Sequence, residues 1–270
     1  MGVARLLPGG PVADRVWGEV AAEVVALRAA GVTPSLATVL VGDDDASAGY
    51  IRIKRRRAAE LGFASPHVRL PASASQVDLH RVIEEFNADR GVHGVLVQHP
   101  VPGGLDYGRA LQVLDPDKDV DGMHPVNLGR LALGLPGPVP CTPAGIEALL
   151  AFHGVSVAGR EVVVLGRGAT LGRPLAMLLG QKRATADAAV TVVHAGVPGI
   201  VRPEHVRPGA VVVGGGVRYA GRRLLPDVDP ACARVAGAIT PRVGGVGPTT
   251  VAMLFRNAVG AARRAVGWGG

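Results

Sequence analysis

The chain has 270 residues, enough for one large or two modest domains, and its 29 Lys or Arg against 22 Asp or Glu give a net charge of +7. Charged residues make up 19% and apolar residues 48%, which excludes disordered and coiled-coil classes. Only three of the basic residues are Lys, the Arg are spread along the chain and aromatic residues make up 3%, so the positive charge does not predict a nucleic-acid-binding surface.

The first half of the chain alternates helical and strand patterns. Apolar residues at helical spacing predict helices over residues 11–30, 47–61 and 75–87, the second capped by Ser47 and closed by Gly62. Compact apolar runs predict strands over residues 35–41, 67–70 and 92–98. Strands separated by helices indicate parallel βαβ units, in which ligands bind at the loops that follow the strands.

A Pro-rich link followed by a helix at residues 138–154 begins a second unit. Strands are predicted over residues 160–166, 190–194, 210–213 and 237–239, and a last helix over residues 250–265. We therefore expect an α/β protein of two domains. The first covers residues 1–139 and is completed by the C-terminal helix at 250–270, and the second covers residues 140–249.

Cysteine usage and hydropathy indicate the cellular compartment of the protein. Cys141 and Cys232 are isolated and form neither a zinc pattern nor a disulfide framework. The N-terminus reaches Gly and Pro before an apolar signal core could form, and no apolar run reaches the ~18 residues that span a bilayer. We expect a cytoplasmic protein without a metal site and without membrane contact.

Tyr50 and Lys54 lie four residues apart and so share one face of the second predicted helix. Lys exchanges a proton near neutral pH when neighbouring cations lower its pKa, whereas Arg does not, and Arg55 and Arg57 could supply those cations. In a chain that uses Arg nearly everywhere, Lys54 is a candidate acid–base residue. A solvated basic helix face is the alternative, and the residues alone leave both open.

Polar residues gather after the strand at 92–98. Gln98 ends that strand, as an ordinary terminator or as a carboxamide that donates and accepts toward a ligand. The segment PDKDVDGMHP (116–125) has the Asp spacing of a calcium loop, but the twelfth place counted from its second residue holds Leu128 instead of Glu, which excludes calcium. His99 and His124 have no partner at ligand spacing and are expected to be structural.

Two glycine-rich segments mark the second half. VVVLGRGATLGRP (162–174) is typical of a strand, a glycine turn and a helix start, whose backbone amides can hold a pyrophosphate. The next strand ends in His194 without the acidic residue that would hold the ribose of NAD, so NADP is favoured, with Arg167 near its extra phosphate. GGVGPTT (244–250) suits a flat or anionic ligand at a helix start, or is an ordinary tight loop.

Taken in order, these motifs resemble one family, the bifunctional methylenetetrahydrofolate dehydrogenase/methenyltetrahydrofolate cyclohydrolases. The resemblance runs from about Val41 to Ala258 through VGDDDASAGYIRIKRRRAAELG, GVLVQHPVP, PDKDVDGMHPVNLG, CTPAGIEALL, VLGRGATLGRP and ITPRVGGVGPTTVAML. It implies an N-terminal folate-binding catalytic domain, a Rossmann-like domain that binds NADP, tetrahydrofolate derivatives as substrates and a homodimer.

The resemblance also implies the reaction and the residues that carry it. Methylenetetrahydrofolate would be oxidised to methenyltetrahydrofolate with NADP, and this product hydrolysed to formyltetrahydrofolate. The catalytic and substrate-binding residues would be Lys54, Tyr50, Gln98 and Asp121, with Asp121 anchoring the folate. The remaining substrate-binding residues would be Gly244, Gly245 and Pro248, and the cofactor-binding residues Gly166, Arg167, Gly168, Gly172, Arg173 and Pro174.

The chain departs from the family pattern in the second domain. Gly168 stands where the family usually has Ser, and Gly214 where it usually has Asp. Only 15 residues separate His194 from Ala210, where the family has a further helix and strand, so this domain is expected to be shortened by one helix–strand unit of about twenty residues. A cyclohydrolase with weak or lost dehydrogenase activity, or a non-catalytic folate-binding paralogue, is the alternative function.

Overall fold

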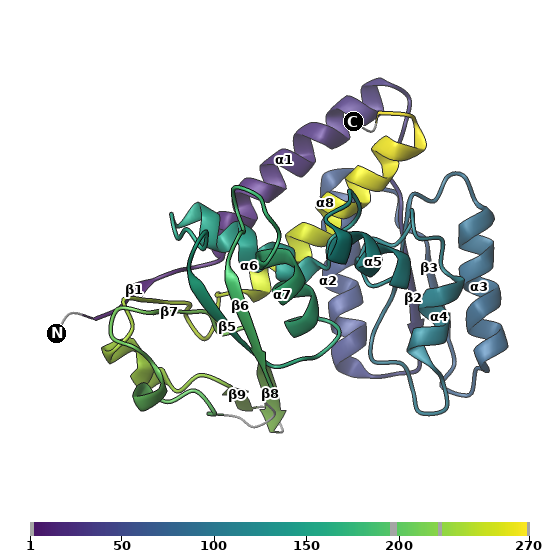
Figure 1. The fold of residues 1–270 in the computed structure, drawn as a ribbon. Coiled ribbons are helices and arrows are strands. Elements are labelled where there is room, and N and C mark those ends of the chain that lie inside the picture. Colours follow the sequence, from purple (N-terminus) through teal and green to yellow (C-terminus); the bar gives the residue numbers. More distant parts are fainter. Residues whose placement is uncertain (1–2, 195–198, 221–222, 269–270) are drawn as a thin grey trace. The chain divides into compact units, whose positions relative to one another are not determined.

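The computed structural model describes residues 3–194, 199–220 and 223–268, which fold into two compact α/β units (Figure 1). Unit 1 consists of Met1–Val16 and Pro140–Met253, and unit 2 of Trp17–Val139 and Leu254–Gly270. Two helices, α1 (Gly10–Ala29) and α8 (Gly247–Ala265), contribute to both units. None of the described helices is long and apolar enough to cross a membrane.

Unit 2 is built on a parallel sheet of three strands in the order β3-β2-β4. The strands are β2 (Leu36–Val41), β3 (His67–Leu70) and β4 (Gly94–Val97), which confirms the three strands predicted for the first half. Figure 1 shows α2 (Asp45–Leu61) on one side of these strands and α3 (Gln76–Ala88) with α4 (Tyr107–Val113) on the other. A further helix of this unit, α5, covers Pro125–Leu133.

The parallel sheet of unit 2 is buried in the apolar core of that unit. Every residue of β2 is buried, and alternate residues of the strand pack with the apolar faces of α3 and α4. On α1 and α8, Trp17 and Phe255 meet edge to face at 5.5 Å, and Phe63 meets Phe255 at 5.2 Å. The motifs predicted to form the site in the first half therefore follow strands and helices that a continuous core holds in place.

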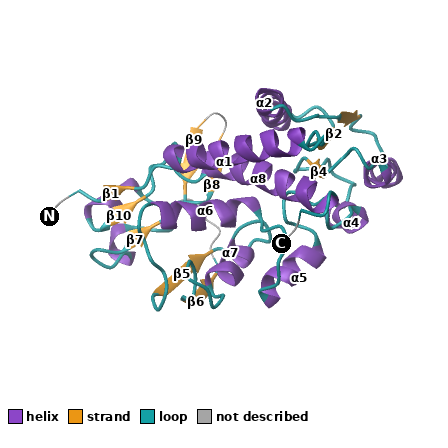
Figure 2. Ribbon diagram, turned by 90° about the horizontal axis from the view of Figure 1, so that it is seen from above, coloured by secondary structure: helices purple, strands orange, loops and turns teal. Residues whose placement is uncertain are grey.

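Unit 1 contains its parallel strands in two separate sheets (Figure 2). One pairs β5 (Glu161–Leu165) with β6 (Ala189–Val193), and the other has the order β1-β10-β7, formed by Arg5–Leu6, Ala238–Ile239 and Val211–Val212. An antiparallel pair joins β8 (Val217–Ala220) and β9 (Arg223–Pro226). The helices are α6 (Cys141–Phe152), α7 (Gly172–Leu179) and two 3-10 turns at Pro203–His205 and Pro230–Arg234.

Several sequence predictions need correction. The sequence analysis identifies no helix between Gln98 and the Pro-rich link, where the structure has α4 and α5. The residue that caps α2 is Asp44, whose carboxylate accepts a hydrogen bond from the Ser47 backbone N–H at 2.7 Å, so the expected cap at Ser47 is wrong. The last helix begins at Gly247 instead of residue 250, and β1, β8 and β9 were also missed.

Candidate functional site

A lysine and a glutamine form the central polar pair of unit 2. Lys54 lies in the third turn of α2, and Gln98 follows directly on β4, where its backbone N–H still donates to the Val39 carbonyl at 2.8 Å. The Lys54 Nζ donates to Gln98 Oε1 at 3.0 Å. The amide nitrogen of Gln98 donates to the His99 carbonyl at 2.8 Å, which orients its oxygen toward the lysine. The structure thus brings together two predicted site residues that are 44 positions apart.

Tyr50 lies one turn before Lys54 on the same helix, and its side chain is 50% exposed. Such a position leaves an aromatic ring and a hydroxyl accessible to a ligand beside the lysine. The predicted alternative, a fully solvated basic face, does not describe Lys54, because its bond to Gln98 is partly buried. The two residues therefore differ in setting: the lysine is held by a partner in the fold, and the tyrosine faces outward.

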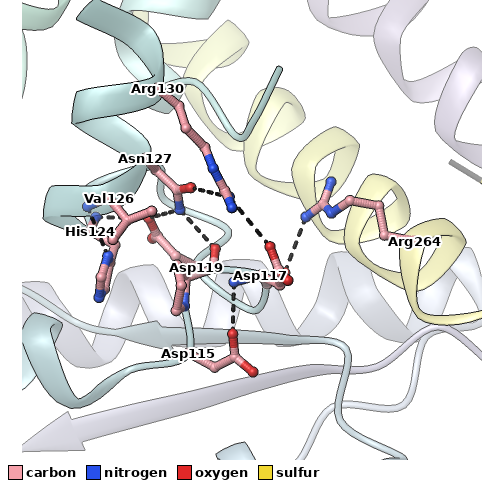
Figure 3. Close-up of polar contacts among 9 residues, drawn as sticks. Asp115, Asp117, Asp119, His124, Val126, Asn127, Arg130 and Arg264 are labelled. Carbon is pink, nitrogen blue, oxygen red and sulfur yellow. Dashed lines mark hydrogen bonds and ion pairs between the residues drawn. The ribbon is translucent and has the colours of Figure 1, made fainter. Parts of the chain in front are cut away.

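The turn that carries Asp121 is held by a network of side chains around Asp119 (Figure 3). Asp119 is only 1% exposed and its carboxylate accepts three hydrogen bonds. They come from the Gly122 N–H at 3.0 Å, the His124 N–H at 2.8 Å and the Asn127 side-chain amide at 2.9 Å. Asp121 itself is half-buried between two held residues, Val120 and Gly122. The sequence placed the function of this segment on Asp121 and missed Asp119.

The same turn is fixed to two helices, α3 and α8. The ammonium of Lys118 donates to the carbonyls of Phe86, Asn87 and Asp89 at the C-terminal end of α3, at 2.7–2.9 Å. Burial lowers the pKa of Lys118, which the carboxylates of Asp115 and Asp89 partly offset. The Val120 carbonyl accepts from Asn257 of α8 at 2.9 Å.

Charged side chains close the outer side of this network (Figure 3). Arg130 of α5 lies 3.3 Å from the Asp117 carboxylate and donates to Asn127 Oδ1 at 3.0 Å, while Arg264 of α8 donates to the Asp117 carbonyl at 3.1 Å. His124 is buried and caps α5, since its Nδ1 accepts from the Val126 N–H at 3.0 Å. His124 is therefore structural, as predicted.

In unit 1, the predicted cofactor residues form a tight strand–turn–helix. β5 ends at Leu165, Gly166 has φ +112°, and α7 begins at Gly172. A Cβ on Gly172 would lie 1.9 Å from the Gly166 carbonyl oxygen, so only glycine allows the two backbones to approach this closely. Arg167 and Arg173 are exposed beside the turn, while Pro174 is buried. The helix N-terminus and the exposed arginines suit a phosphate.

The glycine loop that contains Gly244, Gly245 and Pro248 is also closely packed within unit 1. Gly244 has φ +76°, and its carbonyl accepts from the Gly9 N–H at 2.8 Å. A Cβ on Gly9 would lie 1.9 Å from the Gly245 carbonyl oxygen. The sequence analysis missed Gly9, although the Leu-Pro-Gly-Gly run at 7–10 is a turn signal of the same kind.

Two further observations define what unit 1 offers a ligand. Gly214, which follows β7, donates its N–H to the buried Thr240 hydroxyl at 2.8 Å, and a Cβ on Gly216 would lie 1.9 Å from the Asp227 carboxylate. Among the residues described by the structure, no three His, Cys, Asp or Glu gather in a way that could hold a metal ion. Residues 195–198, which belong to the segment expected to be shortened, lie outside the described residues.

Comparison with known proteins finds the same two parts. The family described as "Tetrahydrofolate dehydrogenase/cyclohydrolase, catalytic domain" matches residues 7–121, and "Tetrahydrofolate dehydrogenase/cyclohydrolase, NAD(P)-binding domain" matches residues 140–266. The "Bifunctional protein FolD 1" of Salinispora tropica is 76% identical over 283 positions, which cover 98% of this chain and 92% of that protein. The alignment is longer than the 270 residues of this chain, so at least 13 positions of the relative have no counterpart here.

Solved structures agree over nearly the full length. The FolD methylenetetrahydrofolate dehydrogenase/cyclohydrolase of Campylobacter jejuni has a TM-score of 0.91 at 33% identity, covering 97% of this chain and 99% of its own. The FolD of Trypanosoma brucei, described as complexed with NADP cofactor and inhibitor, has a TM-score of 0.89 at 37% identity, covering 98% of this chain and 99% of its own.

Proposed function

This chain belongs to the tetrahydrofolate dehydrogenase/cyclohydrolase family, and from that premise we propose that it interconverts one-carbon tetrahydrofolates by two successive reactions. Methylenetetrahydrofolate is oxidised to methenyltetrahydrofolate with NADP, and methenyltetrahydrofolate is hydrolysed to formyltetrahydrofolate. The hydrogen bond of 3.0 Å between Lys54 and Gln98 is the observation that carries the proposal, because it places a lysine next to a fixed carboxamide at a strand end.

Hydrolysis needs a proton to move as water adds to a carbon cation. The water oxygen bonds to the methenyl carbon and loses one proton, which leaves a neutral carbinolamine. Its hydroxyl gives up the second proton as a carbon–nitrogen bond breaks, the formyl group forms, and the released nitrogen takes up a proton, so one proton is released overall. Lys54 is the group we assign to this proton movement, since an amine can exchange a proton and a guanidinium cannot. Gln98 holds the Nζ of Lys54 in place, and Tyr50 lies on the adjacent turn.

Folate binding is assigned to Asp121 together with the Gly244, Gly245 and Pro248 loop. A carboxylate accepts hydrogen bonds from the amino and ring N–H groups of a pterin edge, and two such bonds fix its orientation. The turn around Asp121 is held on both sides in unit 2, which supports this role because a fixed acceptor loses little entropy on binding.

NADP fits the glycine turn of unit 1. The close approach of Gly172 to the Gly166 carbonyl makes the turn before α7 tight, and Arg167 and Arg173 are exposed beside it, where their charges suit a pyrophosphate. The residues assigned to hold the cofactor are Gly166, Arg167, Gly168, Gly172, Arg173 and Pro174. When bound, NADP accepts a hydride from the methylene carbon of the folate.

A second candidate function, a cyclohydrolase with weak dehydrogenase activity, is favoured by a specific observation in unit 1. Its parallel strands form two separate sheets, whereas a dinucleotide site of this type spans the strand ends on both sides of a switch point. A non-catalytic paralogue is disfavoured by the Lys54–Gln98 pair, which a binding protein would not require.

The assembly and location follow from the family resemblance. We propose a homodimer that acts in the cytoplasm and binds neither nucleic acid nor membranes. Sedimentation of the purified chain tests the dimer: a monomer at the concentrations used for assay would contradict it.

The decisive experiment replaces Lys54 by Arg, which keeps the charge but substitutes a guanidinium that stays protonated near neutral pH. We expect Lys54→Arg to lower the rate of methenyltetrahydrofolate hydrolysis by about two orders of magnitude or more. The matched control is Lys182→Arg, an exposed lysine of unit 1, which should hydrolyse at the unmodified rate. Near-normal hydrolysis by the Lys54 variant would overturn the assignment.

A further inference from the structure

The carboxylate of Asp119 is the most completely satisfied acidic group of the polar network in unit 2. It is buried, its Oδ1 accepts from Gly122, and its Oδ2 accepts from both His124 and Asn127. None of the steps proposed above uses this residue. A buried carboxylate costs free energy unless its acceptors are filled, so three donors on one side chain indicate a site built around it.

The donors to Asp119 belong to the turn on which Asp121 stands. Gly122 directly follows Asp121, and His124 follows two residues later, at the start of α5. On the other side, Asp119 continues the sheet through a parallel bridge with Val95 of β4. The Asp119 carboxylate therefore joins the backbone that follows Asp121 to the backbone that precedes it.

The backbone of the turn does not hold its own conformation if this tie is lost. Gly122 has φ +73°, a conformation that the local sequence does not impose by itself. Asn127 connects the carboxylate to α5, and its amide also donates to the Pro116 carbonyl at 2.8 Å. The path of the backbone through Asp121 is therefore set by the hydrogen bonds of Asp119.

We propose that Asp119 is a positioning residue for folate binding, which acts by fixing the carboxylate of Asp121. This inference rests on the proposed function, in which Asp121 binds the folate. Asp119 is fully buried by its own chain, so its effect on the substrate passes through Asp121.

The test is a double-mutant cycle on folate affinity. Asp119→Asn keeps the size of the side chain but turns an N–H toward at least one of the three donors, which displaces the turn. We expect the dissociation constant for tetrahydrofolate, measured by fluorescence titration, to rise about tenfold or more. In the Asp121→Ala background, the same substitution should change that constant by less than about twofold, because the group it positions is gone.

Asp117→Asn is the matched control, because Asp117 lies in the same segment with an exposed carboxylate that pairs with Arg130. Its folate affinity should stay unchanged. If Asp119→Asn does not fold, as judged by circular dichroism, Asn127→Ala takes its place: it removes one of the three donors and should show the same dependence on Asp121 with a smaller effect.

The outcomes distinguish a failure of the role proposed for Asp121 from a failure of the role inferred for Asp119. If Asp121→Ala leaves folate affinity unchanged, the proposed role of Asp121 fails. If Asp121→Ala weakens binding but Asp119→Asn does not, or if the two losses simply add, Asp119 is only structural and the inference is overturned. A loss that disappears in the Asp121→Ala background supports it.

Discussion

The two units contain parallel strands of similar composition but bury them to very different extents. The six residues of β2 in unit 2 are all buried, whereas β5 in unit 1 buries only Val164 of its five residues. Val163 is 61% and Leu165 is 47% exposed. Both strands are rich in Val and Leu, so strand propensity does not account for the difference. The difference comes from the neighbouring strands: β2 pairs on both edges, whereas among the described residues β5 pairs with β6 alone.

The residues proposed for the two activities lie on sheets that differ in size and burial. The Lys54–Gln98 pair and the turn around Asp119 stand on the continuous sheet and its helices. The glycine turn of unit 1 stands at the end of a strand that has one unpaired edge within the described residues. We therefore expect hydrolysis to be the more robust of the two activities.

The largest expected effect is on NADP. In the second candidate function the chain lacks several charged contacts to phosphate and ribose, and their loss, at about 1–3 kcal/mol each, weakens binding by orders of magnitude. Calorimetry should therefore give an NADP dissociation constant far above the micromolar range, with a dehydrogenase rate well below the hydrolysis rate and NADP still preferred over NAD. Micromolar NADP binding by the unmodified chain, with comparable rates for both reactions, would contradict this expectation.

The next effect concerns the folate. Asp121→Ala leaves polar groups of the pterin unpaired, so we expect folate binding to weaken by about 2–4 kcal/mol and both half-reactions to suffer. Titration of the variant with tetrahydrofolate measures the loss. If only one of the reactions changes, a shared folate site is excluded.

A third prediction compares the two sheets directly. Val39 is fully buried in β2, and Val39→Ala should lower the free energy of unfolding by about 2 kcal/mol. Val163→Ala in β5 should change it by less than about 0.5 kcal/mol, because its side chain is mostly in water. Urea denaturation of both variants measures the difference, and equal losses would show that β5 is covered in solution.

The smallest expected effect is on acid stability. Burial lowers the pKa of His93, and the charge of Lys118 adds to this, while Asp89 opposes it. Its ring Nδ1 is buried without a hydrogen-bond partner in the structure. At His93 the unfolded state therefore binds a proton more readily than the folded state. The contribution of the neutral imidazole to folding stability is present above pH ~6.5 and is lost as the pH falls through the folded pKa.

Replacing His93 tests that assignment. His93→Leu should reduce the acid-induced loss of stability, whereas His205→Asn, at an exposed position of unit 1, should leave it unchanged. Thermal denaturation between pH 7 and pH 5 provides the measurement. An unchanged slope in the His93 variant would show that another group dominates.

Much of the fold of unit 2 could be predicted from the sequence, because its strands are compact apolar runs bounded by glycine. The helix α5 could not, since its N-terminal cap is His124, a residue type that does not signal a helix start. In α2, an Asp and a Ser three residues apart both suit a cap, and only the backbone conformation of Asp44 decides between them.

The candidate site was predictable in part for a similar reason. Lys54 and Gln98 could be placed on a helix and at a strand end, but their contact depends on how α2 packs beside the sheet. In the segment 115–121, four Asp residues alternate with other types, and the sequence does not say which one turns inward. The bridge to Val95 and the positive φ of Gly122 select Asp119.

The contact of Val120 with β4 has a consequence for how the family can vary. A Cβ on Gly94 would lie 2.3 Å from Val120 Cγ1, and Val120 precedes the residue assigned to folate. A relative that acquires a side chain at the position of Gly94 must therefore shrink the residue at Val120 or shift the turn. We expect these two positions to covary among homologues, and substitutions at either one to be accepted in evolution mainly as a pair.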